Sequence, residues 1–185
     1  ASKIVQLLTE PEAFWAQSSR PLPVSFSEAA ARGTQFHERL EEAFDLEADL
    51  DISDWQEQDQ KLGQAFLDSR FSSLETLYVE QTLEFELGGT VVVCKLDAVY
   101  QADDGFEVVD WKSGSSPKSK AEVTSKAVQL ALYRIGLSRW LGVGVERVNA
   151  SFFFAGDAKE ISPEVPSEKE LVEKLMAFRK APLRF

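Results

Sequence analysis

The sequence contains a single cysteine, Cys94, among its 185 residues. One thiol cannot form an internal disulfide, so the disulfide framework of small secreted domains is excluded. One thiolate also cannot hold a zinc ion without further ligands, and it cannot build a four-cysteine iron-sulfur cluster. We therefore predict a cytoplasmic protein with no iron-sulfur cluster.

Long apolar runs are missing as well. No stretch approaches the roughly 20 apolar residues that a membrane-spanning helix needs. Residues 1–10 lack the basic and then apolar pattern of a signal peptide. We expect no membrane partner. Because the only methionine is Met176, we also expect the chain to be a piece of a longer polypeptide.

Basic charge is scarce, with 20 Lys and Arg against 31 Asp and Glu and a net charge of -11. Neutralising the phosphates of a nucleic acid needs clustered lysine and arginine. DNA affinity spread over the whole surface is therefore excluded, and any nucleic-acid contact must be local or supplied by a partner. The charge of residues 45–60 is almost wholly acidic, and we interpret this segment as a solvated loop or an exposed helical turn.

The chain does have enough apolar material for one core, since 44% of its residues are hydrophobic. Its length and composition predict a single domain over residues 1–185. Hydrophobic periodicity divides the chain into elements. In order, we expect an N-terminal segment with a short helix (1–27), a helix broken at Gly33 (28–44), a short helix (61–69), a two-stranded hairpin (91–100 and 106–109), a long helix (122–141), a strand (147–154) and a last helix behind a Ser167/Glu170 capping box (167–180). This order predicts an α/β fold in which helices flank a central mixed β-sheet.

Three residues on the predicted hairpin could carry chemistry. Side chains alternate across a strand, so Asp110 and Lys112 emerge on one face while their neighbours take the other. The turn at 103–105 brings Asp97 on the partner strand close to Asp110. Two carboxylates can bind one hard cation such as Mg²⁺ or Mn²⁺, and a lysine beside them can activate water or stabilise charge on a phosphate. Alone, this pattern also fits an ordinary surface ion pair.

Further elements in a fixed order strengthen the catalytic interpretation. Together the elements resemble the RecB-like branch of the PD-(D/E)xK nuclease superfamily over residues 33–154. They are Gly33-Thr34-Gln35-Phe36-His37, similar to the Gly-Thr-x-Phe-His element of that family, Glu80 ahead of the hairpin, Asp97 with Asp110-Trp111-Lys112-Ser113-Gly114, and Gln129 with Tyr133 one helical turn later. The resemblance implies a restriction-endonuclease-like core over residues 28–154. Cys94 stands where the family commonly has glycine three residues before the first aspartate.

The resemblance also implies a role for each of these residues. The expected ligands of Mg²⁺ or Mn²⁺ are His37, Asp97, Asp110 and the backbone carbonyl of Trp111. The expected catalytic residues are Asp97, Asp110, Lys112 and Glu80. In isolation His37 would be interpreted as an ordinary core or surface histidine.

Contacts with DNA are expected next to this site. The resemblance places Gln129 and Tyr133 beside the DNA. Three lysines between the Asp-x-Lys strand and the following helix, with one glutamate among them, offer a local positive rim for phosphates, although a solvated loop would have the same composition. They are Lys118, Lys120 and Lys126.

The sequences of these elements are also similar to those of the C-terminal nuclease domain of actinobacterial UvrD/RecB-type, AdnAB-like helicase-nucleases. That similarity implies hydrolysis of single-stranded DNA in repair or recombination, with helicase motor domains in the same full-length chain and a second helicase-nuclease subunit as partners. No Gly-x-x-x-x-Gly-Lys-Ser/Thr phosphate loop occurs here, so ATP hydrolysis would belong to another part. The alternatives are a non-catalytic DNA-binding or docking module and a stand-alone exonuclease.

Overall fold

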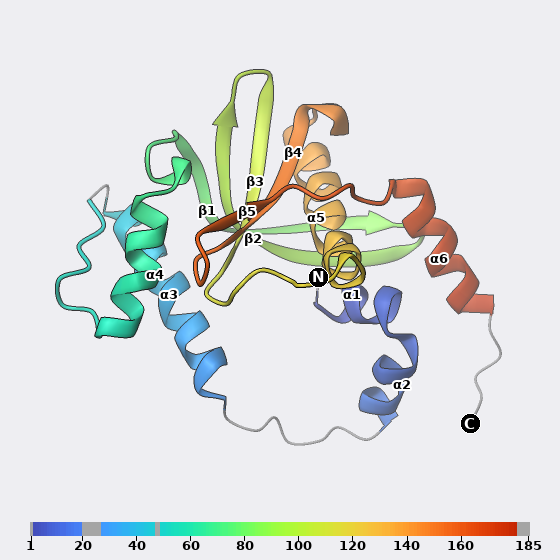
Figure 1. The fold of residues 1–185 in the computed structure, drawn as a ribbon. Helices are drawn as coiled ribbons and strands as arrows, with labels where there is room; N and C mark the ends of the chain where they lie inside the picture. Colours follow the sequence, from blue (N-terminus) through green and yellow to red (C-terminus); the bar gives the residue numbers. More distant parts are fainter. Residues whose placement is uncertain (1, 20–26, 47–48, 181–185) are drawn as a thin grey trace.

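A computed structural model describes residues 2–19, 27–46 and 49–180. Within these ranges five strands form one sheet in the order β1-β2-β3-β4-β5, and helices lie against both of its faces (Figure 1). The strands are β1 (Thr76–Leu87), β2 (Thr90–Ala102), β3 (Gly105–Lys112), β4 (Val148–Phe154) and β5 (Lys159–Ile161). Neighbouring strands run antiparallel except β3 and β4, which are parallel. The predicted α/β fold with a mixed sheet flanked by helices is confirmed.

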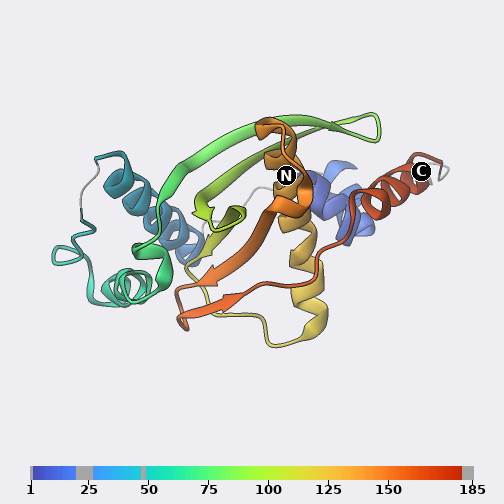
Figure 2. The same ribbon diagram turned by 90° about the horizontal axis from the view of Figure 1, so that it is seen from above.

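The helices fall into two groups on opposite faces of the sheet (Figure 2). On one face lie α3 (Glu28–Asp45) and α4 (Glu57–Leu67), and the 3₁₀ turn η1 (Arg70–Ser72) follows α4. On the other lie α5 (Lys120–Leu141), α1 (Ser2–Thr9) and α6 (Glu168–Lys180), while α2 (Pro11–Ser19) packs on α1 and the 3₁₀ turn η2 (Val145–Arg147) leads into β4. In the described part of the chain, no helix combines the length and the apolar character needed to cross a bilayer.

Each face of the sheet buries its own core. The core under α5 is largely aliphatic, and β3 contributes Val108 to it. The core under α3 and α4 is largely aromatic, and β3 contributes Val109 and Trp111. Trp111 is fully buried there and contacts the rings of Phe44 and Phe66, at centroid distances of 5.8 and 5.7 Å. The alternation predicted for β3 is confirmed.

Two strands change faces in the middle of the sheet. In β2, Leu96 belongs to the α5 core, whereas Ala98, two residues later, belongs to the α3 core. In β1, Val79 belongs to the α3 core, whereas Leu83 lies in the α5 core. Regular alternation would keep residues of the same parity on one face, so both strands are irregular at this point.

Glu80 and Asp97 share the step of the β1–β2 ladder at which this change occurs, between two regular pairs. The backbone of Glu80 has a φ of 52°, in the left-handed region that residues other than glycine seldom adopt. Such a conformation costs about 1–3 kcal/mol and is often found at functional sites. Glu80 and Asp97 lie opposite each other at this step, so the pairing of β1 with β2 brings two acidic residues together at the irregular point of the sheet.

The structure corrects five expectations about the helices and strands. Residues 28–45 form one helix without a break at Gly33. The second helix begins at Glu57 rather than at Lys61, and the N-terminal segment contains two helices rather than one. Two strands were not predicted: β1, which is absent from the expected elements, and the short strand β5, whose three residues are too few to show a periodicity.

Helix-end signals in the sequence were more reliable. Gly142 directly follows the predicted helix 122–141 and ends α5 in the left-handed conformation, while the side chain of Ser119 accepts from the backbone N–H of Glu122 at the start. At α6, the backbone N–H of Ser167 donates to Glu170 Oε2 at 2.7 Å, and the N–H of Glu170 donates to Ser167 Oγ at 3.3 Å. The predicted capping box is confirmed.

Candidate active site

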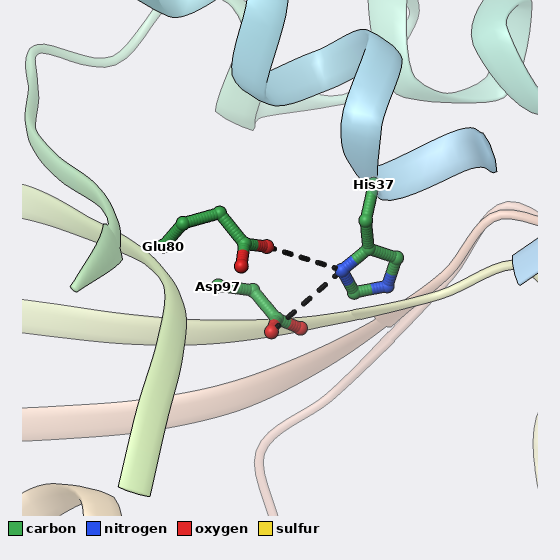
Figure 3. Close-up of side chains that lie close together, drawn as sticks. All are labelled: His37, Glu80 and Asp97. Carbon is green, nitrogen blue, oxygen red and sulfur yellow. Dashed lines mark ion pairs between the residues drawn. The ribbon is translucent and has the colours of Figure 1, made fainter. Parts of the chain in front are cut away.

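Three side chains from three elements converge at the irregular step of the sheet. Figure 3 shows His37 reaching from α3 toward the carboxylates of Glu80 on β1 and Asp97 on β2. Nδ1 of His37 lies 3.5 Å from Oε1 of Glu80 and 3.7 Å from Oδ1 of Asp97. One donor atom from each residue lies within 4.8 Å of the other two. The three groups therefore surround a single point.

The backbone of Trp111 fixes the orientation of the imidazole. His37 Nε2 lies 2.9 Å from the carbonyl oxygen of Trp111, and because a carbonyl can only accept, Nε2 carries the proton of this bond. In the neutral imidazole, Nδ1 then turns a lone pair toward the two carboxylates. Three electron-rich groups around one point repel each other unless a cation lies among them. One imidazole and two carboxylates are a set of ligands that suits a divalent metal ion.

Asp97 is held rigidly in this group. The backbone N–H of Trp111 donates to its Oδ2 at 2.8 Å, across from β3. Asp97 is only 8% exposed. Burial, together with the negative charge of Asp110, raises the pKa of Asp97 well above its usual range, and Lys112 opposes that shift. A cation bound beside Asp97 would favour its ionised form.

Asp110 and Lys112 form an ion pair next to this group, on the same side of β3. Asp110 is completely buried. Burial alone would lower the pKa of Lys112, but the charges of Asp110 and Asp97 outweigh it, and its pKa is raised. Lys112 is therefore a cation at neutral pH, and its side chain remains 32% exposed toward solvent.

Gln129 and Tyr133 lie on α5 behind Asp110. Gln129 Nε2 donates to Oδ1 of Asp110 at 2.9 Å and to the Tyr133 hydroxyl at 2.7 Å. Burial and the charge of Asp110 raise the pKa of Tyr133, so its hydroxyl stays protonated. Tyr133 is only 3% exposed. The contacts that the structure gives these two residues orient Asp110.

Lys95 is a member of the site that the sequence analysis missed. It forms an ion pair with Glu80, and this pair is the main reason that the pKa of Lys95 is raised. The signal was present in the sequence, because Lys95 precedes Asp97 by two residues on one strand and such residues share a face. Glu80, which we expected among the catalytic residues and not among the metal ligands, lies within the group of potential metal ligands.

A hollow of about 410 Å³ opens beside the converging side chains, and we call it the acidic hollow. Two further glutamates line it from α3, and His37 and Glu41 are one helical turn apart. The charged or titratable residues that line it are His37, Glu38, Glu41, Glu80, Lys95 and Asp97.

A second hollow, of about 400 Å³, lies at the end of β3, and we call it the basic hollow. The loop 113–117 lines it, and its charged residues are Lys112, Lys118, Glu122 and Lys126. Two of the three lysines predicted to contact DNA thus lie beside Lys112. The third, Lys120, lines a different hollow, between α5 and α6.

The loop that lines the basic hollow is tied to the turn after β4. The carboxylate of Asp157 accepts from the backbone N–H and the hydroxyl of Ser116, at 2.9 and 2.6 Å. The N–H of Ala155 donates to the carbonyl of Lys112 at 2.8 Å. These bonds fix the chain that leaves the Asp-x-Lys segment.

The family model of the PD-(D/E)XK nuclease superfamily matches residues 1–181. The chain belongs to this superfamily. Its members generally use divalent metal ions, which agrees with the donor set at the irregular sheet step. The match also reaches well beyond residues 33–154, over which the four sequence elements occur, and includes α1, α2 and α6.

Several solved structures share the fold, and two of them illustrate the likeness. One, from Eubacterium rectale, is called a "Putative exonuclease"; it has a TM-score of 0.59 and 13% identity, and the match covers 90% of this chain and 69% of that one. The other, SSO0001, has a TM-score of 0.51 and 20% identity, with 98% and 77% covered. At these identities the likeness concerns the fold alone. No curated protein matches the sequence.

Proposed function

We propose that this domain is a deoxyribonuclease that hydrolyses phosphodiester bonds with the help of Mg²⁺ or Mn²⁺. One observation carries the proposal: His37, Glu80 and Asp97 surround a single point directly beside the buried Asp110–Lys112 pair. Carboxylates and imidazole together bind such ions, and a lysine beside them can assist the hydrolysis of a phosphodiester. Membership of the nuclease superfamily supports this chemistry.

His37, Glu80 and Asp97 would hold the ion, with Asp110 as a further ligand. The carbonyl of Trp111, which we also expected as a ligand, accepts from the N–H of His37 Nε2 and so lies on the side of the imidazole away from Nδ1. A bound divalent ion supplies Lewis acidity toward the phosphate and lowers the pKa of water. Lys112 is protonated, because the neighbouring carboxylates raise its pKa. It therefore acts as a hydrogen-bond donor that orients the attacking water and stabilises negative charge on the phosphate, not as a base. Gln129 holds Asp110 in place for this work.

The substrate that we propose is single-stranded DNA. The acidic chain has few basic residues with which to hold a long duplex, and the local lysines lie at the basic hollow. The resemblance to AdnAB-like enzymes supports delivery of the strand by helicase motor domains of the same full-length chain, with a second helicase-nuclease subunit, in DNA repair or recombination. The mature protein would then act in the cytoplasm.

Cleavage of end-labelled single-stranded DNA tests the enzymatic proposal. We expect cleavage with Mn²⁺, none with EDTA, and a loss of about 100-fold or more in Asp110→Asn and Lys112→Met, since the first removes a charged ligand of the ion and the second removes the cation at the phosphate. Glu84→Gln serves as the control, because it removes an exposed carboxylate from the same sheet away from the site. Unchanged cleavage by Asp110→Asn would contradict the assignment.

Metal binding separates an enzyme from the non-catalytic alternative. Titration calorimetry should detect Mn²⁺ binding to the wild type and much weaker binding to His37→Ala. A folded wild type that binds DNA but neither binds Mn²⁺ nor cleaves would instead be a docking module.

A further inference from the structure

Two hollows of opposite charge meet at the candidate active site. Of the described residues that line the acidic hollow, four carry carboxylates and one is a lysine. Of those that line the basic hollow, three are lysines and one is a glutamate. Asp97 lines the first and Lys112 the second, and the charges of these two residues interact directly. The sign of the surface charge therefore reverses across the place where a phosphate would react.

The hollows are also adjacent in space. Gly33 lines the acidic hollow and Ser113 lines the basic one. A Cβ atom on Gly33 would lie only 3.2 Å from Oγ of Ser113. The two hollows therefore adjoin at the active site, with Asp97 lining one and Lys112 lining the other.

A bound metal ion would not remove this difference. The ion would offset the charges of its ligands Glu80 and Asp97. Glu38 and Glu41 lie outside the group of potential ligands among the described residues and would keep their charge, with only Lys95 to oppose them. The charge of Glu41 contributes to the raised pKa of Lys95, which agrees with its position facing the site.

The difference in charge between the two hollows affects how a DNA strand, with a phosphate at every nucleotide, can bind. Cleavage inside a strand requires phosphates on both sides of the reacting one, and a phosphate in the acidic hollow meets like charges. Cleavage next to an end avoids this repulsion, because the terminal nucleoside carries no further phosphate diester. The basic hollow meanwhile holds the rest of the strand.

We infer that the acidic hollow is a terminus-binding subsite, in which Glu38 and Glu41 restrict cleavage to the ends of DNA strands. This inference rests on the proposed nuclease function and specifies its mode: the strand body lies on Lys118 and Lys126, and the terminal nucleoside enters the acidic hollow. Glu38 and Glu41 are specificity-determining residues, because they act on the next phosphate and do not touch the reacting one.

The experiment compares a linear and a covalently closed circular single-stranded DNA of one sequence, with Mn²⁺. For the wild type, the initial rate on the linear strand should exceed that on the circle by about tenfold or more. In Glu38→Gln/Glu41→Gln the ratio should fall to about threefold or less, because cleavage of the circle rises. Added salt should lower the wild-type ratio too, since exposed charges are screened.

Glu42→Gln is the matched control, because it makes the same change on the same helix but lines another hollow. Its ratio should equal that of the wild type. A double variant with the wild-type ratio, or a wild type that cuts both strands equally, would overturn the inference and leave the nuclease function standing. A wild type that cuts neither strand, while folded and supplied with Mn²⁺, would overturn both.

Discussion

Two buried acidic clusters lie three residues apart on β3, and they are built in opposite ways. At the first, Glu107 accepts two bonds from Arg70, at 2.9 and 2.7 Å, and one from Ser151 at 2.8 Å. Arg70 also binds Glu160, so this Arg70 cluster joins η1, β3, β4 and β5. At the second, around Asp97 and Asp110, carboxylates face other carboxylates, and one cation, Lys112, compensates them together with hydrogen bonds from Gln129 and the backbone N–H of Trp111.

The difference separates a structural ion pair from a functional one. Buried charges that are paired and fully hydrogen-bonded are tolerated, and removing one partner is destabilising. Carboxylates that raise each other's pKa destabilise the folded protein. Proteins retain such groups where a function requires them. The strained backbone of Glu80 lies beside the second cluster, whereas no residue of the Arg70 cluster has a positive φ. Stability and activity should therefore respond oppositely to changes in the two clusters.

The largest expected effect is that of Asp97→Asn. The amide oxygen can still accept from the N–H of Trp111, while the charge is lost. We expect kcat/KM to fall by about 100-fold or more. Without metal, the free energy of unfolding should rise by about 1 kcal/mol, because a repelled carboxylate is removed. Cleavage assays measure kcat/KM, and urea unfolding in EDTA measures the free energy of unfolding. A variant that is less stable than the wild type would contradict the proposed difference between the two clusters.

Arg70→Ala should have the reverse profile. It leaves Glu107 buried without its main partner. We expect a loss of about 2 kcal/mol, less than for a fully buried pair, because the side chain of Arg70 is 45% exposed. At temperatures where the variant is still folded, its kcat/KM should stay within about twofold of that of the wild type. If activity fell as far as in Asp97→Asn, the Arg70 cluster would belong to the active site.

The pH dependence of stability sharpens the comparison. The pKa of Asp97 is raised in the folded state above its ordinary value of 3.8. The folded state thus binds this proton more tightly, so the metal-free protein should gain stability as the pH falls through the folded pKa, with the gain complete below the ordinary value. Unfolding in EDTA at several pH values, with Asp97→Asn subtracted, isolates the contribution. A difference curve of opposite slope would refute the electrostatic account.

The smallest effects are expected at the lysines. Lys118→Gln and Lys126→Gln should each raise KM by about threefold with little change in kcat, because they remove charge from the basic hollow. Lys120→Gln should change KM less, since Lys120 lines another hollow. Steady-state kinetics at two salt concentrations separate these cases. Equal effects of all three substitutions would favour the broad positive rim predicted from the sequence.

Local patterns predicted much of this molecule. The β2–β3 hairpin, the alternation of Asp110 with Trp111 and the capping box at Ser167 each depend on a few neighbouring residues, and each is confirmed. The superfamily was also accessible, because its elements keep their order along the chain. The order of the elements is what singles out His37, since its own surroundings in the sequence would suggest an ordinary histidine.

Long-range features could not be predicted in this way. The face change at Glu80 and Asp97 breaks the period of two that strand prediction assumes, so nothing local places these carboxylates together. The bond from Gln129 to Asp110 depends on how α5 packs on the sheet. Lys120 was grouped with its neighbours by sequence, but the turn of the helix directs it to a different hollow.

Anomalous diffraction from a crystal soaked in Mn²⁺ tests the central claim most directly. The account predicts a manganese peak between His37, Glu80 and Asp97, which disappears in Asp97→Asn. A well-diffracting crystal of active protein with no manganese at that position, or with the ion at a different acidic group, would contradict it.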